Sequence, residues 1–220
     1  MTTEGEGLAR PARTGFGTTR IEALSDGIFA VAMTLLVLDI KLPGDEPFAS
    51  SSELFAHLWS LARHYLLYFV TFIVLGMLWI GHHAQFHFVR YVDHTLLWLN
   101  LMFLFVITSI PFATDLLGDY HALNLPYAIY GFKLMLAAAL LILQILYLRR
   151  HPVLAEPTLT ATVARKVIVR SALFACVPLL SMAMMLYNTQ LALYLYFLLP
   201  VIHFLPGRVD ELRPPGADEA

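Results

Sequence analysis

Residues 20–40 have the sequence RIEALSDGIFAVAMTLLVLDI, in which a polar opening turn precedes a long apolar run. A membrane-spanning helix needs about 20 mostly apolar residues. Five further segments reach this length or come close to it, at 62–80, 96–117, 126–148, 167–187 and 191–205. The second is expected to continue as helix to Arg90, and the last is the shortest and contains Pro200. The sequence therefore predicts an all-α integral membrane protein with six transmembrane helices.

The composition agrees with a lipid environment. The chain has 220 residues, of which 59% are hydrophobic and only 14% are charged, whereas soluble domains carry about 25% charged residues. The net charge of −2 gives no indication of a nucleic-acid partner, and none is expected. The single cysteine, Cys176, lies in an apolar run, which excludes an internal disulfide and a cysteine-based metal site.

Lysine and arginine residues predict the orientation of the spans. The side of the membrane that carries both termini holds most of them: Arg10, Arg13, Arg20, Arg90, Arg149, Arg150, Arg165, Lys166, Arg170, Arg208 and Arg213. The other side has only Lys41 and Arg63. Because positive charge favours the cytosolic side, both ends are predicted to be cytosolic in the cell membrane. We expect a disordered N-terminus at 1–18, a membrane domain at 19–206 and a cytosolic tail at 207–220.

The first helix carries an apolar stripe and, separately, a polar pair. At about 100° per residue, Val31, Thr34, Leu35 and Leu38 share one face. Ser25 and Asp26 point roughly 120–140° away from the centre of that stripe. Ionisable groups inside a membrane are rare and usually functional, so Asp26 indicates a special role for this helix, although it could also merely cap or anchor it.

Three polar residues on the next two spans lie at the depth of Ser25 and Asp26. Trp79 and His82 come late in the second span, and Asn100 comes early in the third. Because alternate spans run in opposite directions, all three fall near the cytosolic end. The sequence predicts one hydrogen-bonded cluster among them, of the kind that specifies how helices pack.

These residues also form motifs that resemble a known family. The motifs are Arg20-x-x-x-Leu24-Ser25-Asp26, Trp79-x-x-His82, and Leu97-x-Leu99-Asn100-Leu101 followed by Pro111-Phe112. They are similar to the first three helices of the transmembrane protein 175 potassium channels, with Leu24 in place of the usual phenylalanine. Prokaryotic members have one six-helix unit per chain. The resemblance implies a homotetramer in the lipid bilayer, with the first helices lining a central pore.

The resemblance also implies the roles of individual residues. Val31, Leu35 and Leu38 match the family's pore constriction, and Thr34 matches the hydroxyl position tied to selectivity. The family lacks the Thr-Val-Gly-Tyr-Gly filter, and so does this chain. Apolar rings can gate by dewetting, so we expect a channel with a modest preference for potassium over sodium. Since valine is smaller than leucine, Leu35 or Leu38 is expected to form the narrowest ring.

The polar cluster is interpreted as a structural lock for the pore helix. Its members are Arg20, Ser25, Asp26, Trp79, His82 and Asn100. Imidazole titrates near neutral pH, which leaves open whether His82 makes the protein pH-sensitive. The permeant potassium ion is the only ligand expected; no catalytic residue, enzyme activity, cofactor or bound metal is predicted.

Other polar residues have ordinary explanations beside functional ones. Asp39, with Asp45 and Glu46, could concentrate cations at an outer mouth or belong to a solvated loop. His83 and His87 have the spacing of a two-histidine metal site, but an interfacial position explains them as well. Lys133, inside the fourth span, is expected to snorkel toward the interface.

Two other functions compete with a channel. A secondary transporter would show broken helices and internal repeats; Pro178 and Pro200 are the expected mid-span breaks, and no repeat is visible. A histidine-dependent membrane redox or metal protein would need converging ligands at one depth. The sequence leaves the gating trigger and the open or closed state undetermined.

Overall fold

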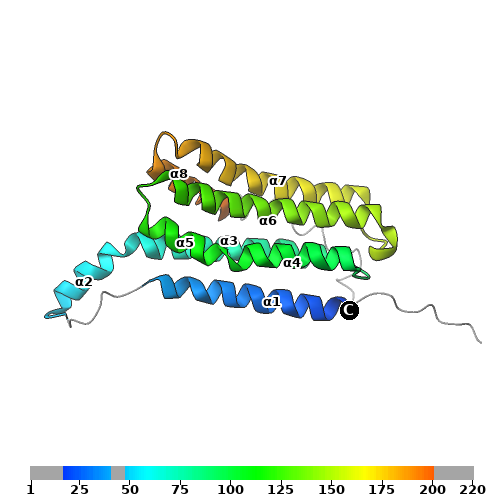
Figure 1. Cartoon of the computed structure of the whole chain (residues 1–220), viewed down its shortest axis with the longest axis horizontal. Coiled ribbons are helices and arrows are strands. Elements are labelled where there is room, and N and C mark those ends of the chain that lie inside the picture. Colours follow the sequence, from blue (N-terminus) through cyan, green and yellow to red (C-terminus); the bar gives the residue numbers. More distant parts are fainter. Residues whose placement is uncertain (1–16, 41–47, 201–220) are drawn as a thin grey trace, which may run out of the picture.

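The computed structural model describes residues 17–40 and 48–200, with the backbone alone at Asp39. In this part of the chain every regular element is a helix (Figure 1). Five helical segments within it are long and apolar enough to cross a membrane: Thr18–Leu38, Ala62–Phe86, His94–Asp119, Asn124–Arg150 and Ala161–Met184. A shorter apolar helix, Thr189–Pro200, lies where the sixth span was predicted. The all-α membrane fold is therefore confirmed, while residues 201–205 of the predicted sixth span fall outside the described residues.

The helices form layers, with the first helix on one side of the bundle. The elements in chain order are α1 (Thr18–Leu35), the 3₁₀ helix η1 (Leu36–Asp39), α2 (Ser51–Ser60), α3 (Ala62–Phe86), α4 (His94–Thr108), α5 (Ile110–Asp119), α6 (Asn124–Arg150), the 3₁₀ helix η2 (Pro152–Leu154), α7 (Ala161–Met184) and α8 (Thr189–Leu195). Figure 1 shows α1 as an outer layer beside α3, α4 and α5, with α6 and then α7 beyond them. The packing agrees, since α1 contacts α3 and α4, α4 contacts α6, and α6 contacts α7.

The third span is broken, which corrects the prediction of one helix over 96–117. α4 ends at Thr108 and α5 begins at Ile110, with Ser109 between them. Pro111 has no N–H and cannot continue the helical ladder to the carbonyl of Ile107. The backbone N–H of Ser109 instead donates to the carbonyls of Val106 and Ile107, so the break leaves this end of α4 capped.

The prediction that Pro178 breaks a span was wrong. α7 runs without interruption from Ala161 to Met184 and includes Pro178, whose side chain is buried. Neighbouring helices can satisfy the backbone groups that a proline frees inside a membrane helix.

The helix α2 lies in a segment where the sequence analysis expected only a loop. It begins after Ser50, whose hydroxyl accepts a hydrogen bond from the Glu53 N–H at 3.2 Å. The Glu53 carboxylate in turn accepts from the N–H of Ala49 at 2.9 Å. This arrangement is a variant of the capping box, with the carboxylate bonded to the N–H of the residue before the N-cap. A serine followed three residues later by a glutamate already indicates such a cap in the sequence.

Two apolar clusters hold the bundle together. The larger one fills the interior between all the spans, with Phe29, Phe103 and Leu134 among its buried members. The smaller one lies at the end that carries the first turn of α1 and includes Ile21 and Leu148. Beside it an antiparallel bridge between Val89 and Ala155 joins the α3–α4 connection to the segment after α6. The first turn of α1 is thereby packed on a rigid base.

Candidate functional site

α1 has one buried face and one exposed apolar face. Its buried residues are Ile21, Ser25, Phe29 and Ala32, and Leu36 continues this face into η1. Their spacing of three and four residues is that of a single helix stripe. They pack against α3 and α4, so the rotation of α1 about its own axis is fixed by its inner side.

The predicted constriction residues lie on the other side. Val31, Leu35 and Leu38 are 56%, 42% and 64% exposed, respectively. Large apolar side chains exposed in a row indicate a surface that meets lipid or another chain. The helix changes from α to 3₁₀ at Leu36, and side chains three residues apart eclipse in a 3₁₀ helix. Leu38 therefore stacks almost directly above Leu35 along the helix axis.

The hydroxyl of Thr34 is oriented by the helix itself. Its Oγ1 donates to the carbonyl of Val31 at 2.9 Å, and the side chain is exposed. A hydroxyl that donates its only proton keeps its oxygen lone pairs as acceptors. On the exposed face these lone pairs are suited to contact a cation.

A directional chain of hydrogen bonds joins α1 to α3 and α4. His82 Nε2 donates to Asn100 Oδ1 at 2.8 Å, and Asn100 Nδ2 donates to Ser25 Oγ at 3.4 Å. Ser25 Oγ then donates to the backbone carbonyl of Ile21 at 2.9 Å. All three side chains are at most 2% exposed, so each one satisfies a polar group that would otherwise be unpaired.

Aromatic rings enclose His82. Its imidazole stacks on Phe103 with a centroid distance of 5.2 Å and on Phe86 at 4.4 Å. Phe29 of α1 lies at 6.2 Å from the same ring. The histidine is therefore held between α1, α3 and α4, with its Nε2 directed at Asn100.

Asp26 belongs to a second, separate contact. Its Oδ1 accepts a hydrogen bond from Trp79 Nε1 at 2.8 Å, and the Trp79 indole stacks on His83 at 5.7 Å. Both Asp26 and Trp79 are exposed. The predicted single cluster is thus divided in the structure into a buried chain and an exposed pair, both of which join α1 to α3.

Two of the predicted site residues stand apart from these contacts. Arg20 lies in the first turn of α1 with an exposed side chain, and among the described residues it makes no hydrogen bond or ion pair with the other lock residues. Asp39 ends η1, but its side chain lies outside the described part, as do Asp45 and Glu46. The outer-mouth hypothesis thus stays a prediction.

The comparisons with known proteins agree with these motifs. A family model described as the endosomal/lysosomal potassium channel TMEM175 matches residues 20–111. A potassium channel of Streptomyces collinus is 38% identical over 161 residues, which are 70% of this chain and 75% of that protein. The chain belongs to the TMEM175 family.

A solved structure and an animal protein extend the comparison. The crystal structure of a lysosomal potassium-selective channel TMEM175 homolog from Chamaesiphon minutus superposes with a TM-score of 0.71 and 27% identity, covering 84% of this chain and 95% of that one. The mouse endosomal/lysosomal proton channel TMEM175 is 37% identical over 99 residues, which are 43% of this chain and 20% of the mouse protein. The bundle described above is therefore the TMEM175 fold.

The TMEM175 match coincides with the elements that build the candidate site. It runs from Arg20 to Pro111, and so covers α1, α2, α3, α4 and the first turn of α5. Every constriction and lock residue lies in this part of the chain. The later helices lie beyond it: α6 packs against α3, α4 and α5, and α7 and α8 pack against α6.

Sequence reasoning misplaced one charged residue of this TMEM175 chain. Lys133 of α6 was expected to snorkel to the interface, but its Nζ donates to Ser109 Oγ at 2.7 Å. Ser109 occupies the break between α4 and α5, where the C-terminal end of α4 carries partial negative charge. Lys133 therefore stabilises the broken span. The sequence showed a lysine in one span and a proline in another, but gave no signal that the two lie close together.

The histidines of the described residues do not converge on one point. Among residues 17–40 and 48–200, no group of three histidine, cysteine or acidic side chains has metal-binding geometry. His83 contacts Trp79 and His87 contacts Phe88. Within the described residues, the histidine-dependent redox or metal protein therefore has no supporting site.

Proposed function

We propose that this TMEM175 chain forms a potassium channel in which four copies of α1 line a central pore. The exposed stripe of Val31, Leu35 and Leu38 carries this proposal. It lies on α1, which forms an outer layer of the bundle (Figure 1), while the buried face of the same helix packs against α3 and α4. The potassium-channel names of the bacterial relatives support the same function.

Conduction would be controlled by apolar rings. Four copies of Leu35, with four of Leu38 directly above them, would form a narrow hydrophobic segment that excludes water when closed and wets when the helices separate. The ring of Thr34 oxygens beneath them offers acceptors to a partly dehydrated ion. Without a cage of backbone carbonyls, we expect only a modest preference for potassium over sodium.

The remaining parts of the proposal follow from this role. The buried chain of Ser25, Asn100 and His82 and the pair of Asp26 and Trp79 act as a lock that holds α1 in register. The protein works without an enzyme activity or a cofactor, with potassium as the permeant ion. It resides in the cell membrane as a homotetramer with both termini in the cytosol.

Currents through purified protein in planar bilayers test the proposal. We expect unitary currents whose reversal potential in a potassium–sodium gradient shows a preference for potassium. Leu35→Ala and Leu38→Ala should raise conductance and lower that preference, because each removes bulk from the constriction. Val37→Ala is the matched control, since Val37 is 48% exposed but points to a different side of the helix. Unchanged conductance and selectivity in both leucine variants would refute the mechanism.

The same recordings separate the competing functions. A secondary transporter gives slow flux without unitary currents. The mouse relative is named a proton channel, so a second set of recordings uses a pH gradient with equal potassium on both sides. A reversal potential that follows the proton gradient would show that protons, and not potassium, are the permeant ion. The mass of the detergent-solubilised complex tests the tetramer.

A further inference from the structure

α2 is a regular helix that the rest of the chain barely supports. It has ten residues, none of them buried. Its start is defined locally by Ser50 and Glu53. Among the described residues its main helix contact is with α3, which directly follows it, and His57 meets the ring of Phe48. Isolated helices shorter than about 12–15 residues are marginal in water. We therefore infer that α2 is stabilised by apolar surroundings that the described residues do not provide.

The residues of α2 are arranged for such a phase. At about 100° per residue, Leu54, Leu58, Phe55 and Trp59 fall within an arc of roughly 140°. Glu53, Ala56, His57 and Ser60 occupy the opposite side. Phe55 is 68% and Trp59 is 73% exposed. A helix with a polar face and a large aromatic face is typical of segments that lie in the plane of a membrane interface.

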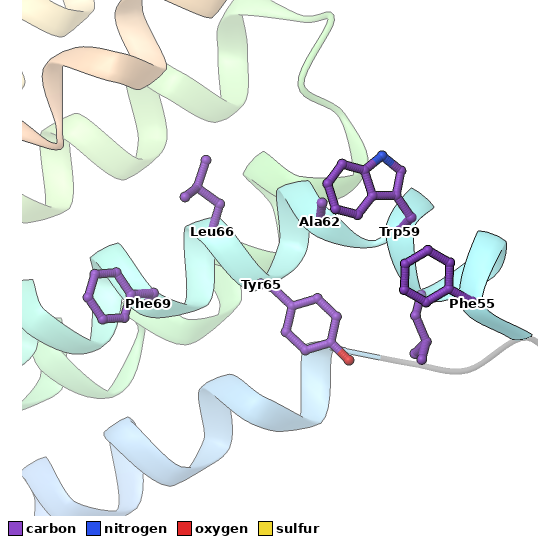
Figure 2. Close-up of a pocket in the computed structure, with 7 residues that line it drawn as sticks. Phe55, Trp59, Ala62, Tyr65, Leu66 and Phe69 are labelled. Atoms are coloured by element: carbon purple, nitrogen blue, oxygen red, sulfur yellow. The ribbon is translucent and has the colours of Figure 1, made fainter.

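The apolar face of α2 opens into a hollow shared with α3. The hollow has a volume of about 420 Å³ and is lined by Phe55, Leu58, Trp59, Ala62, Tyr65, Leu66 and Phe69 (Figure 2). None of these side chains is charged. Figure 2 shows the aromatic side chains following α2 and the first turns of α3. The hollow ends at Phe69, which is 58% exposed and lies within the span Ala62–Phe86.

Continuity with the membrane span identifies the occupant. Beyond Phe69 the exposed apolar surface of α3 continues with Phe72, at a depth where the surroundings are hydrocarbon. Trp59 lies at the other end of the hollow and Tyr65 lies between the two ends (Figure 2). These two residue types gather where hydrocarbon meets headgroups. The hollow thus runs from headgroup level into the hydrocarbon region, which is the path of a phospholipid acyl chain.

We propose that α2 lies in the membrane interface at the end of the bundle opposite Arg149 and Arg150, and that its hollow holds an acyl chain of a bilayer phospholipid. The aromatic face of α2 is submerged at the boundary between headgroups and hydrocarbon, while Glu53, Ala56 and Ser60 face water. The inference requires only that the chain spans a membrane, and it holds whether or not the protein conducts potassium.

Spin labels on the full-length chain in phosphatidylcholine vesicles test this placement. In a Cys176→Ser background, labels are attached at Phe55→Cys and Trp59→Cys on the aromatic face. Ala56→Cys and Ser60→Cys on the opposite face are the matched controls. We expect molecular oxygen, which partitions into lipid, to relax the labels at 55 and 59 more than a water-soluble nickel complex does. The order should invert at 56 and 60.

Each other pattern contradicts the proposal. Nickel access at all four positions would place α2 in water. Labels at 55 and 59 that are immobile, closed to both reagents and broadened by neighbouring labels would show that a second copy of the chain covers the face. A variant on the aromatic face that fails to reconstitute is replaced by Leu58→Cys, and Ala56→Cys and Ser60→Cys serve as replacements for each other on the polar face.

Discussion

Ser25, Asn100 and His82 form a chain in which each side chain donates a hydrogen bond to the next acceptor. Such a chain is vulnerable at its middle member. Removing Asn100 leaves the buried N–H of His82 without an acceptor and takes from Ser25 the hydrogen bond that its hydroxyl oxygen accepts. An unpaired buried group costs about 1–3 kcal/mol. The asparagine is therefore the residue on which the contact of α1 with α3 and α4 depends most.

A double-mutant cycle of Ser25→Ala and Asn100→Ala measures this coupling. We expect Asn100→Ala to lower the free energy of unfolding more than Ser25→Ala, and the two effects to be non-additive by about 0.6 kcal/mol, with about 1.7 as the upper range for interhelical hydrogen bonds in membranes. Chemical unfolding in detergent gives the numbers. Thr108→Ala combined with Ser25→Ala is the control, because the exposed Thr108 hydroxyl contacts only its own helix. Additive effects for Ser25 and Asn100 would show that no such coupling exists.

At this scale the sequence indicated which residues would meet but not how they would pair. Depth along the spans placed Trp79, His82 and Asn100 near Ser25 and Asp26, and all five do make contacts among themselves. Consecutive residues point about 100° apart on a helix, so Ser25 and Asp26 had to face different neighbours. Which one turns inward depends on the rotation of α1, which the packing of Phe29 and Ala32 determines.

At the scale of the element, η1 places one residue in the core and the next residue on the surface. Leu36 is 1% exposed and belongs to the core, while the adjacent Val37 is 48% exposed. η1 contacts α3 and α5, so Leu36 anchors the end of α1 that bears Leu35 and Leu38. The anchor Leu36 thus lies between the proposed constriction residues Leu35 and Leu38 in the sequence, but on a different side of the helix.

Leu36→Ala and Val37→Ala should differ sharply in stability. Truncating the buried leucine leaves a cavity, and such changes cost about 2–5 kcal/mol. Truncating the exposed valine should change the free energy of unfolding by about 0.5 kcal/mol or less. Thermal unfolding of both variants in the same detergent makes the comparison. Equal losses would mean that η1 is not anchored through Leu36.

Element boundaries were the part that hydropathy did not provide. A search for 20-residue apolar windows passes over the ten residues of α2, whose signals are a capping box and apolar positions at helical spacing. Hydropathy also predicted α4 and α5 as one continuous helix, because Ser109 and Pro111 hardly lower the mean hydropathy of the span. At Pro178 the sequence predicted a break that is absent. The proline is accommodated inside α7 by the packing of the surrounding helices, and no local sequence pattern indicates this packing.

At the scale of the whole molecule, the layers separate two roles. α1 forms an outer layer whose inner side is fixed by buried contacts and whose outer side carries the apolar stripe (Figure 1). α3 and α4 provide the partners of the polar chain, and α6 and α7 pack behind them. Hydropathy predicted where the five long apolar segments lie, because lipid requires long apolar helices, but not α2 or the break between α4 and α5. Their lateral order depends on side-chain fit between helices.

The orientation of this bundle follows from its charges and is open to direct measurement. Arg149, Arg150 and Arg165 surround the α6–α7 connection, which includes the exposed Thr158, whereas the α5–α6 connection with the exposed Ala122 has no lysine or arginine. In a Cys176→Ser background, a membrane-impermeant maleimide should label Ala122→Cys in intact cells. It should label Thr158→Cys only after the membrane is opened, because positive loops stay in the cytosol. Labelling of both positions in opened membranes controls for reactivity. The reverse pattern in intact cells would place the arginine-rich end outside the cell and the opposite end of the bundle, which carries α2, on the cytosolic side.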